Sequence, residues 1–272
     1  MAQRDGHRPI RLSRAELDGM AAAAATICSC RHELEARGGS IAGEILAGAA
    51  FEAWRHYPDG EAYDPASHAQ FFYHAHPGPG RAAGEHGHFH TFMRAEGMPP
   101  GAVPLLLPEI AVANAAPPQG APLKRGESDK VSHLVAIAVD ERGQPIRLFT
   151  TNRWVTGETW YPADHVIAML DRFAVGGDRP SPLLNRWIGA VLRLFRPQIA
   201  DLLHARDKTV MEWRARRRTP VFEDPRLEIA SSLDIDLDRQ LDFVAQLHAE
   251  ASAGPPRRAQ RLPPMAEGWG EG

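Results

Sequence analysis

The chain has 272 residues, of which 43% are hydrophobic and 24% are charged, and its formal net charge is −3. These proportions are ordinary for a folded globular protein, and they exclude collagen-like and wholly disordered classes. The slightly acidic balance argues against nucleic acid as the main partner, since phosphate-binding domains usually carry a net basic charge. Because no apolar stretch is long enough for a membrane span or a secretory signal, we expect no membrane partner and a cytoplasmic location.

The only two cysteines, Cys28 and Cys30, stand one residue apart in a segment of helical pattern. A disulfide between them is geometrically poor, so the sequence predicts no disulfide framework, in keeping with a reducing compartment. With His32 they resemble a metal-binding triplet, but positions i and i+2 diverge by about 200° on a helix. We therefore interpret both cysteines as structural thiols.

Residues 12–53 are predicted to be helical. A first helix over Leu12–Arg37 has Ser13 and Glu16 in the spacing of a capping box, and its body is rich in alanine. It should end at the glycine pair that follows. A second, shorter helix is predicted over Ile41–Ala53.

Residues 69–160 are predicted to form a sheet. Apolar and polar residues alternate with a period of two over Ala69–Arg94, on both sides of a break rich in Pro and Gly. This pattern predicts a β-hairpin with a long loop at Pro77–Glu85.

The sheet is expected to continue after a long irregular connection at Pro99–Lys130. Val131–Asp140 is apolar on both faces, which is typical of a central strand. A turn then leads into a strand at Pro145–Thr151, which Arg153–Thr156 is expected to extend.

Residues 162–252 are predicted to be helical again. Helices are expected over Pro162–Phe173 and over Pro182–Arg217, and Pro197 should end or kink the second of them. A last amphipathic helix is predicted over Asp236–Ala251.

The predicted fold class is therefore α+β, with a central antiparallel β-sheet flanked by N-terminal and C-terminal helices. Residues 1–254 are expected to form a single globular domain. Residues 255–272 contain Pro, Gly and Arg without periodicity, and we expect them to be a disordered tail.

A cluster of histidines in the first hairpin is the most informative feature of the sequence. Thirteen histidines in 272 residues average fewer than one in a stretch as long as residues 74–90, yet that stretch contains five. These five are His74, His76, His86, His88 and His90. Alternate residues of a strand share a face, so the histidines of each strand are expected to project to one side.

The register of the hairpin decides whether the two sets of histidines meet. Pairing His74 with His88 across the strands brings all five rings to one side of the sheet. The same pairing gathers apolar side chains on the other side: Phe71, Tyr73, Phe89 and Met93. A slip of one residue would mix rings with core side chains, so the hydrophobic pattern predicts the convergent register.

Alternating histidines on a strand are suited to a transition metal, because neutral imidazole is the commonest metal ligand in proteins. Three ligands from one strand are difficult, since residues i and i+4 lie roughly 13 Å apart. We therefore expect the second strand to supply two ligands out of His86, His88 and His90. The coordination of the ion would be completed by His74, His76 or the more distant His133. Nitrogen donors suit Fe, Cu and Zn, and Mn less well.

Three polar residues are candidate catalytic groups. Glu85 directly precedes the second histidine strand, although a solvated loop carboxylate is an equal interpretation. Asn152 and Glu158 lie in a polar segment with two tryptophans just after a strand, as residues of a pocket wall do. An ordinary polar strand end would look similar.

Alternating histidines resemble the metal-binding strands of cupins and of α-class carbonic anhydrases. The cupin pattern is incomplete, since a phenylalanine and a methionine occupy the positions of its expected glutamate. The wider pattern resembles a family of uncharacterised bacterial proteins over most of residues 40–165, and this resemblance implies no activity. Its motifs are His56-Tyr-Pro-Asp-Gly60, Tyr73-His-Ala-His76, Glu85-His-Gly-His-Phe-His90 and Asn152-Arg-Trp-Val-Thr156.

The leading functional hypothesis is a metal-dependent enzyme that acts on a small molecule. Oxidoreductase chemistry is preferred, because no glutamate is obviously placed as the base of a metallohydrolase. A non-catalytic metal-binding or interaction protein is the second hypothesis. A third is a metal-free histidine pocket that binds an anionic small molecule and transfers protons. The oligomeric state stays open, and a solvated histidine face is the interpretation that requires no ligand.

Overall fold

The computed structural model describes residues 12–76, 81–105, 131–217 and 220–253. Its strands are β1 (Tyr57–Tyr63), β2 (Ala69–His74), β3 (Gly87–Arg94), β4 (Val131–Val139), β5 (Pro145–Thr151) and β6 (Ile229–Asp234). Its helices are α1 (Arg14–Ala36), α2 (Ile41–Leu46), α3 (Arg153–Thr156), α4 (Ala163–Leu170), α5 (Pro182–Leu194), α6 (Arg196–Arg216) and α7 (Leu237–Ser252).

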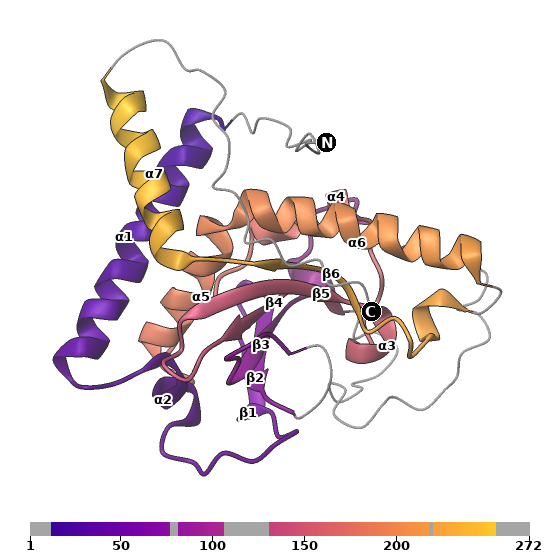
Figure 1. Cartoon of the computed structure of the whole chain (residues 1–272), viewed down its shortest axis with the longest axis horizontal. Coiled ribbons are helices and arrows are strands. Elements are labelled where there is room, and N and C mark those ends of the chain that lie inside the picture. The colour runs from indigo at the N-terminus through magenta and orange to yellow at the C-terminus, as the bar shows by residue number, and fades with distance from the viewer. Residues whose placement is uncertain (1–11, 77–80, 106–130, 218–219, 254–272) are drawn as a thin grey trace, which may run out of the picture.

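The six strands form one antiparallel sheet in the order β1-β2-β3-β4-β5-β6, in which each strand pairs with its neighbour in the sequence. Helices precede and follow the sheet along the chain, and α4 and α6 run across one side of it in Figure 1. The fold is thus α+β, with a central antiparallel sheet flanked by N-terminal and C-terminal helices, as predicted. No helix in the described ranges is both long and apolar enough to cross a bilayer.

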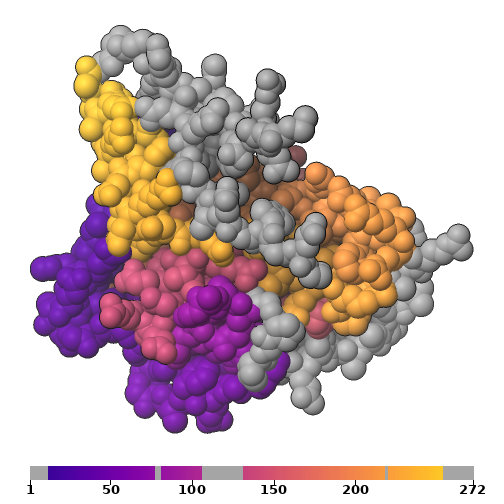
Figure 2. Space-filling view, in the orientation of Figure 1, coloured from indigo at the N-terminus to yellow at the C-terminus, as the bar shows by residue number. Residues whose placement is uncertain are grey.

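One face of the sheet packs against helices. Apolar side chains of the sheet share a single core cluster with α1, α2, α4, α5, α6 and α7. On β2 to β5 they are Ala69, Phe71, Tyr73, Phe89, Met93, Leu134, Val135, Ile137, Val139 and Leu148. α1 and α7 lie side by side at one end of this core (Figure 2). The opposite face carries a separate small cluster that contains Ala136, Ala138 and Phe149. His74, His88 and His90 lie on this second face.

Several predicted boundaries are confirmed. Ser13 and Glu16 form the capping box that starts α1, since each side chain bonds the backbone N–H of the other. The predicted long C-terminal helix is divided at Phe195 into α5 and α6, and Pro197 stands in the first turn of α6, where its missing N–H costs nothing.

Other local predictions are wrong. The second helix ends at Leu46 instead of Ala53, because Ala47 adopts a left-handed conformation with φ of 46°. Arg153–Thr156 forms the short helix α3 and does not extend β5, because the Asn152 side chain accepts a hydrogen bond from the Arg153 N–H as an N-cap.

Two strands lie where none was predicted. β1 contains Pro58, Asp59 and Gly60, which are typical turn residues, and its pairing with β2 is interrupted between Tyr57 and Ala62. β6 lies within the region expected to be helical, and its central serines obscure the strand pattern. The expected disordered tail, 255–272, and residues 106–130 of the expected irregular connection lie outside the described residues.

Gly87 at the start of β3 leaves room for a close contact between neighbouring strands. A Cβ atom at this position would lie 2.7 Å from the carbonyl oxygen of His74 and even closer to the hydroxyl of Tyr73. We expect Gly87→Ala to lower the free energy of unfolding by about 1–3 kcal/mol, because backbone and a buried ring would have to move. Urea denaturation followed by circular dichroism would measure the change.

Gly189→Ala is the matched control. Gly189 lies in α5, and a Cβ atom there would meet no atom within 4 Å. It should raise stability slightly, by up to about 1 kcal/mol, since alanine favours the helix over glycine. Equal stability of the two variants would contradict the proposed crowding at Gly87.

Candidate metal centre

The pairing of β2 with β3 brings the histidines of the two strands together. His74 lies directly opposite His88, as the hydrophobic pattern predicted, and Phe72 lies opposite His90. Alternation along each strand then places these residues on one face, while Phe71, Tyr73 and Phe89 project into the core on the other. The predicted register is confirmed.

Three imidazoles on this face form a compact group. One ring nitrogen from each of His74, His88 and His90 lies within 4.8 Å of the others. His88 and His90 are alternate residues of β3, and His74 reaches across from β2. The side chains are well shielded, with only 4% of His88 and 2% of His90 exposed to solvent. These three residues could hold a metal ion.

Glu85 fixes the orientation of one of these rings. Its Oε1 atom lies 2.7 Å from Nδ1 of His88, and its Oε2 atom accepts a hydrogen bond from the Ala82 N–H at 2.8 Å. Burial opposes ionisation of the carboxyl, but the hydrogen bonds from His88 and Ala82 outweigh it and lower the pKa of Glu85. An ionised Glu85 holds the proton of His88 on Nδ1 and leaves the lone pair of Nε2 for a metal, an arrangement common at histidine-ligated metals.

The free nitrogen of His88 points at the neighbouring strand. Its Nε2 atom lies 2.8 Å from Nε2 of His74, and the ring centroids are 4.6 Å apart. Two nitrogens bound to one tetrahedral zinc ion, with bonds of about 2.0–2.1 Å, would lie roughly 3.3 Å apart. A small outward shift of the two rings therefore converts a hydrogen-bonded pair into a pair of ligands.

The buried imidazoles are held in the neutral form that binds metals. Burial is the largest cause of a lowered pKa at His74, His88 and His90, because a charged ring loses its hydration. Neighbouring histidines lower the pKa of His74 and His90 further, since two positive charges would repel each other. No proton then has to be displaced from an imidazolium before an ion can bind.

A β-bulge brings a fourth histidine behind this group. The pairing of β3 with β4 shifts between Thr91 and Phe92, which leaves Leu134 as an extra residue in β4. By simple alternation His133 would share the helix-covered face with Val135. The bulge turns it to the opposite face, as bulges commonly do to a side chain.

His133 supports His90 from behind. Its Nε2 atom lies 3.0 Å from Nδ1 of His90, and its Nδ1 atom lies 3.5 Å from the hydroxyl of Thr151. Burial lowers the pKa of His133 to about 3, so both rings are neutral. With His90 donating from Nδ1, its Nε2 atom is left for an ion. His133 lies outside the group of three and contacts it through His90.

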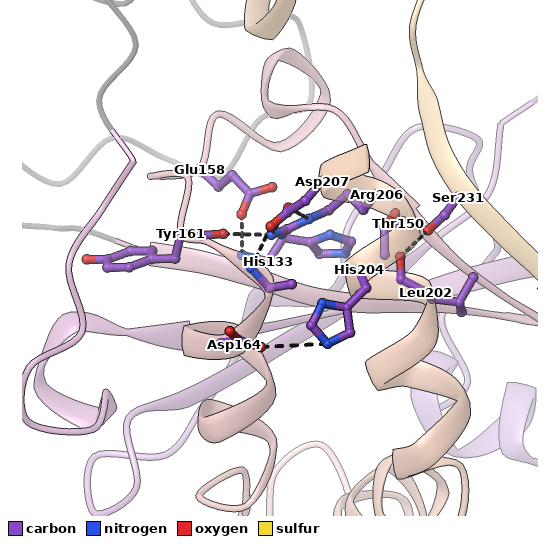
Figure 3. Close-up of polar contacts among 11 residues, drawn as sticks. His133, Thr150, Glu158, Tyr161, Asp164, Leu202, His204, Arg206, Asp207 and Ser231 are labelled. Atoms are coloured by element: carbon purple, nitrogen blue, oxygen red, sulfur yellow. Dashed lines mark hydrogen bonds and ion pairs between the residues drawn. The ribbon is translucent and has the colours of Figure 1, made fainter. Parts of the chain in front are cut away.

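The Glu158 carboxylate contacts the backbone of β4 and does not contact the histidine rings of the group of three. Its Oε2 atom accepts a hydrogen bond from the His133 N–H at 2.8 Å (Figure 3). The residue is 1% exposed. Burial raises the pKa of Glu158 to about 7, against the opposing effect of the Arg206 guanidinium. Arg206 itself stacks on Trp160 and donates to Asp207 and to the carbonyl of Tyr161. The carboxyl thus anchors the strand end that carries His133.

Two of the five clustered histidines lie apart from the group of three. The ring of His76 stacks on Trp54, with centroids 4.5 Å apart, and lies at 5.4 Å from the ring of His88. His86 does not share the histidine face, contrary to the expected convergence of all five rings. Its Nδ1 atom is 2.5 Å from the hydroxyl of Tyr73, which belongs to the core face. β3 begins only at Gly87, so strand alternation does not extend to His86.

The Asn152 side chain forms hydrogen bonds with backbone groups. Its side-chain oxygen accepts from the Arg153 N–H, and its amide donates to the carbonyl of Val221 at 2.7 Å. The side chain is fully buried, and these contacts place it in the connection between β5 and α3.

His56 is a residue of this face that the sequence pattern missed. Its ring stacks on Phe72 with centroids 3.8 Å apart and meets the ring of His74 edge-on at 5.2 Å. Its Nδ1 atom lies 2.9 Å from Oε1 of Glu61. The available signal was the motif His56-Tyr-Pro-Asp-Gly60, but its Pro and Gly indicate a turn and conceal the strand that positions the ring.

Glu158 should give stability a distinctive pH dependence. Its pKa of about 7 in the folded chain exceeds the ordinary value of 4.5, so between these values the folded state holds more protons than the unfolded state, and stability falls as pH rises. Glu158→Gln keeps the hydrogen bond from His133 without this titration. Relative to the variant, the wild type should lose up to about 3 kcal/mol across this pH window. Parallel unfolding curves below pH 4.5 and above pH 7 test this; a constant difference would contradict it.

Comparison with known proteins places the chain in a family. No curated protein and no solved structure matches it significantly. The sequence profile of the family described as Domain of unknown function (DUF6969) matches residues 21–235, a range that contains every histidine of the candidate metal centre. The chain therefore belongs to the DUF6969 family.

Proposed function

We propose that the protein is a metal-dependent enzyme that acts on a small molecule, with His74, His88 and His90 as ligands of one transition-metal ion. The observation that carries the proposal is the group of three neutral imidazoles on two paired strands, with one nitrogen of each within 4.8 Å of the others. His88 and His90 are buried, and His74 is half-buried. Neutral nitrogen donors suit Fe, Cu and Zn, and Mn less well.

The number of possible ligands supports an enzyme over a purely structural site. Structural zinc sites are closed by four protein ligands, whereas catalytic sites commonly use three and keep a position for water or substrate. In the described part of the chain, His, Cys, Asp and Glu side chains form one such group, and it has three members. The ion would supply a Lewis-acidic or redox-active centre at the remaining position.

Oxidoreductase chemistry is the preferred reaction class. A metallohydrolase needs a free carboxylate or a similar base beside the metal-bound water. Two carboxylates beside the rings, Glu85 and Glu61, are each bonded to Nδ1 of a histidine, His88 and His56 respectively. Both are thus engaged in orienting rings, which favours chemistry at the metal over hydrolysis by a carboxylate base.

The surrounding side chains hold the ligands and exclude water. Glu85 orients His88, and His133 orients His90. Phe72 and Phe92 are fully buried beside these rings, and Phe149 lies edge-on to His88 at 5.3 Å. An apolar surround of this kind strengthens electrostatic interactions at the site.

Two other functions remain as alternatives. A non-catalytic metal-binding or interaction protein would use the same ligands without an open position. A metal-free pocket for an anionic small molecule is supported by the direct contact of His74 with His88, which satisfies two nitrogens without an ion. Elemental analysis of protein purified without an affinity tag separates the metal-free alternative from the others.

Metal content should depend on His88 and not on His86. We expect about one equivalent of a transition metal in the wild type and in His86→Gln, and a loss of most of it in His88→Gln. The two substitutions remove the same group at positions two residues apart, but His86 contacts Tyr73 on the core face. Equal metal loss in both variants, or no metal and no binding on titration in the wild type, would contradict the proposed ligand set.

Glu85→Gln should weaken metal binding without abolishing it. The amide keeps the size of the carboxylate but no longer fixes the proton of His88 on Nδ1, and loss of such a partner typically costs about 10- to 100-fold in affinity. Competition with a chromophoric chelator would measure the dissociation constant for Zn²⁺. Glu35→Gln on the exposed surface of α1 is the control, and an affinity of Glu85→Gln within twofold of it would argue against the orienting role.

A further inference from the structure

His56 is held by a hydrogen-bonded chain that runs away from the metal centre. Glu61 places Oε1 at 2.9 Å from Nδ1 of His56, and its Oε2 atom accepts a hydrogen bond from the side-chain amide of Gln70. Gln70 lies on β2 and shares a face with Phe72 and His74 by strand alternation. The chain Gln70–Glu61–His56 therefore fixes both the position and the tautomer of the His56 ring.

The fixed tautomer leaves an acceptor on the far side of the ring. A carboxylate bonded to Nδ1 keeps the proton there, so Nε2 carries a lone pair and points away from Glu61. This Nε2 atom is buried and has no hydrogen-bond partner within the described part of the chain. The Nδ1 atom of the adjacent His74 is likewise buried and without a partner there. Buried polar groups are nearly always satisfied in native proteins, so these two atoms point to a ligand.

His56 lies next to the group of three and is not a member of it. Its ring lies edge-on to His74 at 5.2 Å, but it does not belong to the group whose nitrogens lie within 4.8 Å of one another. The stack on Phe72, at 3.8 Å, holds the ring in a plane beside the group. His56 therefore lies beside the group of three without belonging to it.

We propose that Nε2 of His56 accepts a hydrogen bond from a hydroxyl or amino group of the substrate, and that Glu61 and Gln70 position His56 for this contact. The inference rests on the proposed function, because it places the substrate at the open position of the ion. It assigns a substrate class: small molecules that carry an O–H or N–H donor close to the atom that reaches the ion.

Two matched probes test the proposed donor. Imidazole and 1-methylimidazole both bind a metal through one ring nitrogen, but only imidazole has a second nitrogen that donates a hydrogen bond. Each is titrated into the Co²⁺-loaded full-length protein, and visible absorption reports both Co²⁺ affinity and probe affinity. The ratio of the two dissociation constants is compared between the wild type and variants, so the bulk of the methyl group cancels.

His56→Phe keeps the stack on Phe72 and removes the acceptor. The preference for imidazole should fall about threefold to tenfold in this variant, the range of one neutral hydrogen bond, with Co²⁺ affinity unchanged. Glu61→Gln should produce a smaller fall, because the tautomer is no longer enforced. His32→Phe, on the exposed side of α1, is the control and should leave the ratio unchanged.

Several results would overturn the inference. An unchanged ratio in His56→Phe would contradict the proposed hydrogen bond. A large loss of Co²⁺ affinity in this variant would indicate that His56 is a metal ligand instead. If His56→Phe does not fold, Glu61→Gln decides, and a ratio equal to that of the wild type counts against the proposal. Absence of Co²⁺ binding by the wild type is a separate failure, that of the proposed function itself.

Discussion

The pairing of His74 with His88 is the interaction on which the candidate site depends. It places histidines of two strands on one face and sends Phe71 and Phe89 into the core beneath the helices. A shift of one residue would exchange these faces, and it would cost both the core and the site. The burial of aromatic side chains on one side of the hairpin therefore enforces the convergence of imidazoles on the other.

Buried imidazoles that converge can bind a metal ion only if each ring is neutral and correctly oriented. Burial supplies the first condition, since it lowers the pKa of all three rings of the central group. Partners behind the rings supply the second: Glu85 for His88 and His133 for His90. The same arrangement recurs at Glu61 and His56, where the Nε2 atom of His56 is buried and has no hydrogen-bond partner in the described part of the chain. In each case a hydrogen-bond partner at one ring nitrogen fixes the tautomer and leaves the other nitrogen available.

Glu158 supports the group of histidines indirectly, through the backbone of β4. It bonds the backbone at His133, next to the bulge that turns this histidine toward His90. A carboxyl with a pKa of about 7 in that position is a cost in stability at neutral pH. Arg206 offsets part of it from a buried position of its own.

Local patterns in the amino-acid order were enough for the α+β class, the capping box of α1, the break near Pro197 and the hairpin register, because each depends on neighbours in sequence or on strand alternation. They failed where a contact between residues distant in sequence determines the direction of a side chain. His133 faces His90 only because Leu134 bulges, and His86 turns to Tyr73 because β3 begins one residue later. His56 reaches the site directly before β1, a strand with the composition of a turn. Side-chain direction at a strand end or a bulge depends on the partner strand, so only the assembled sheet determines it.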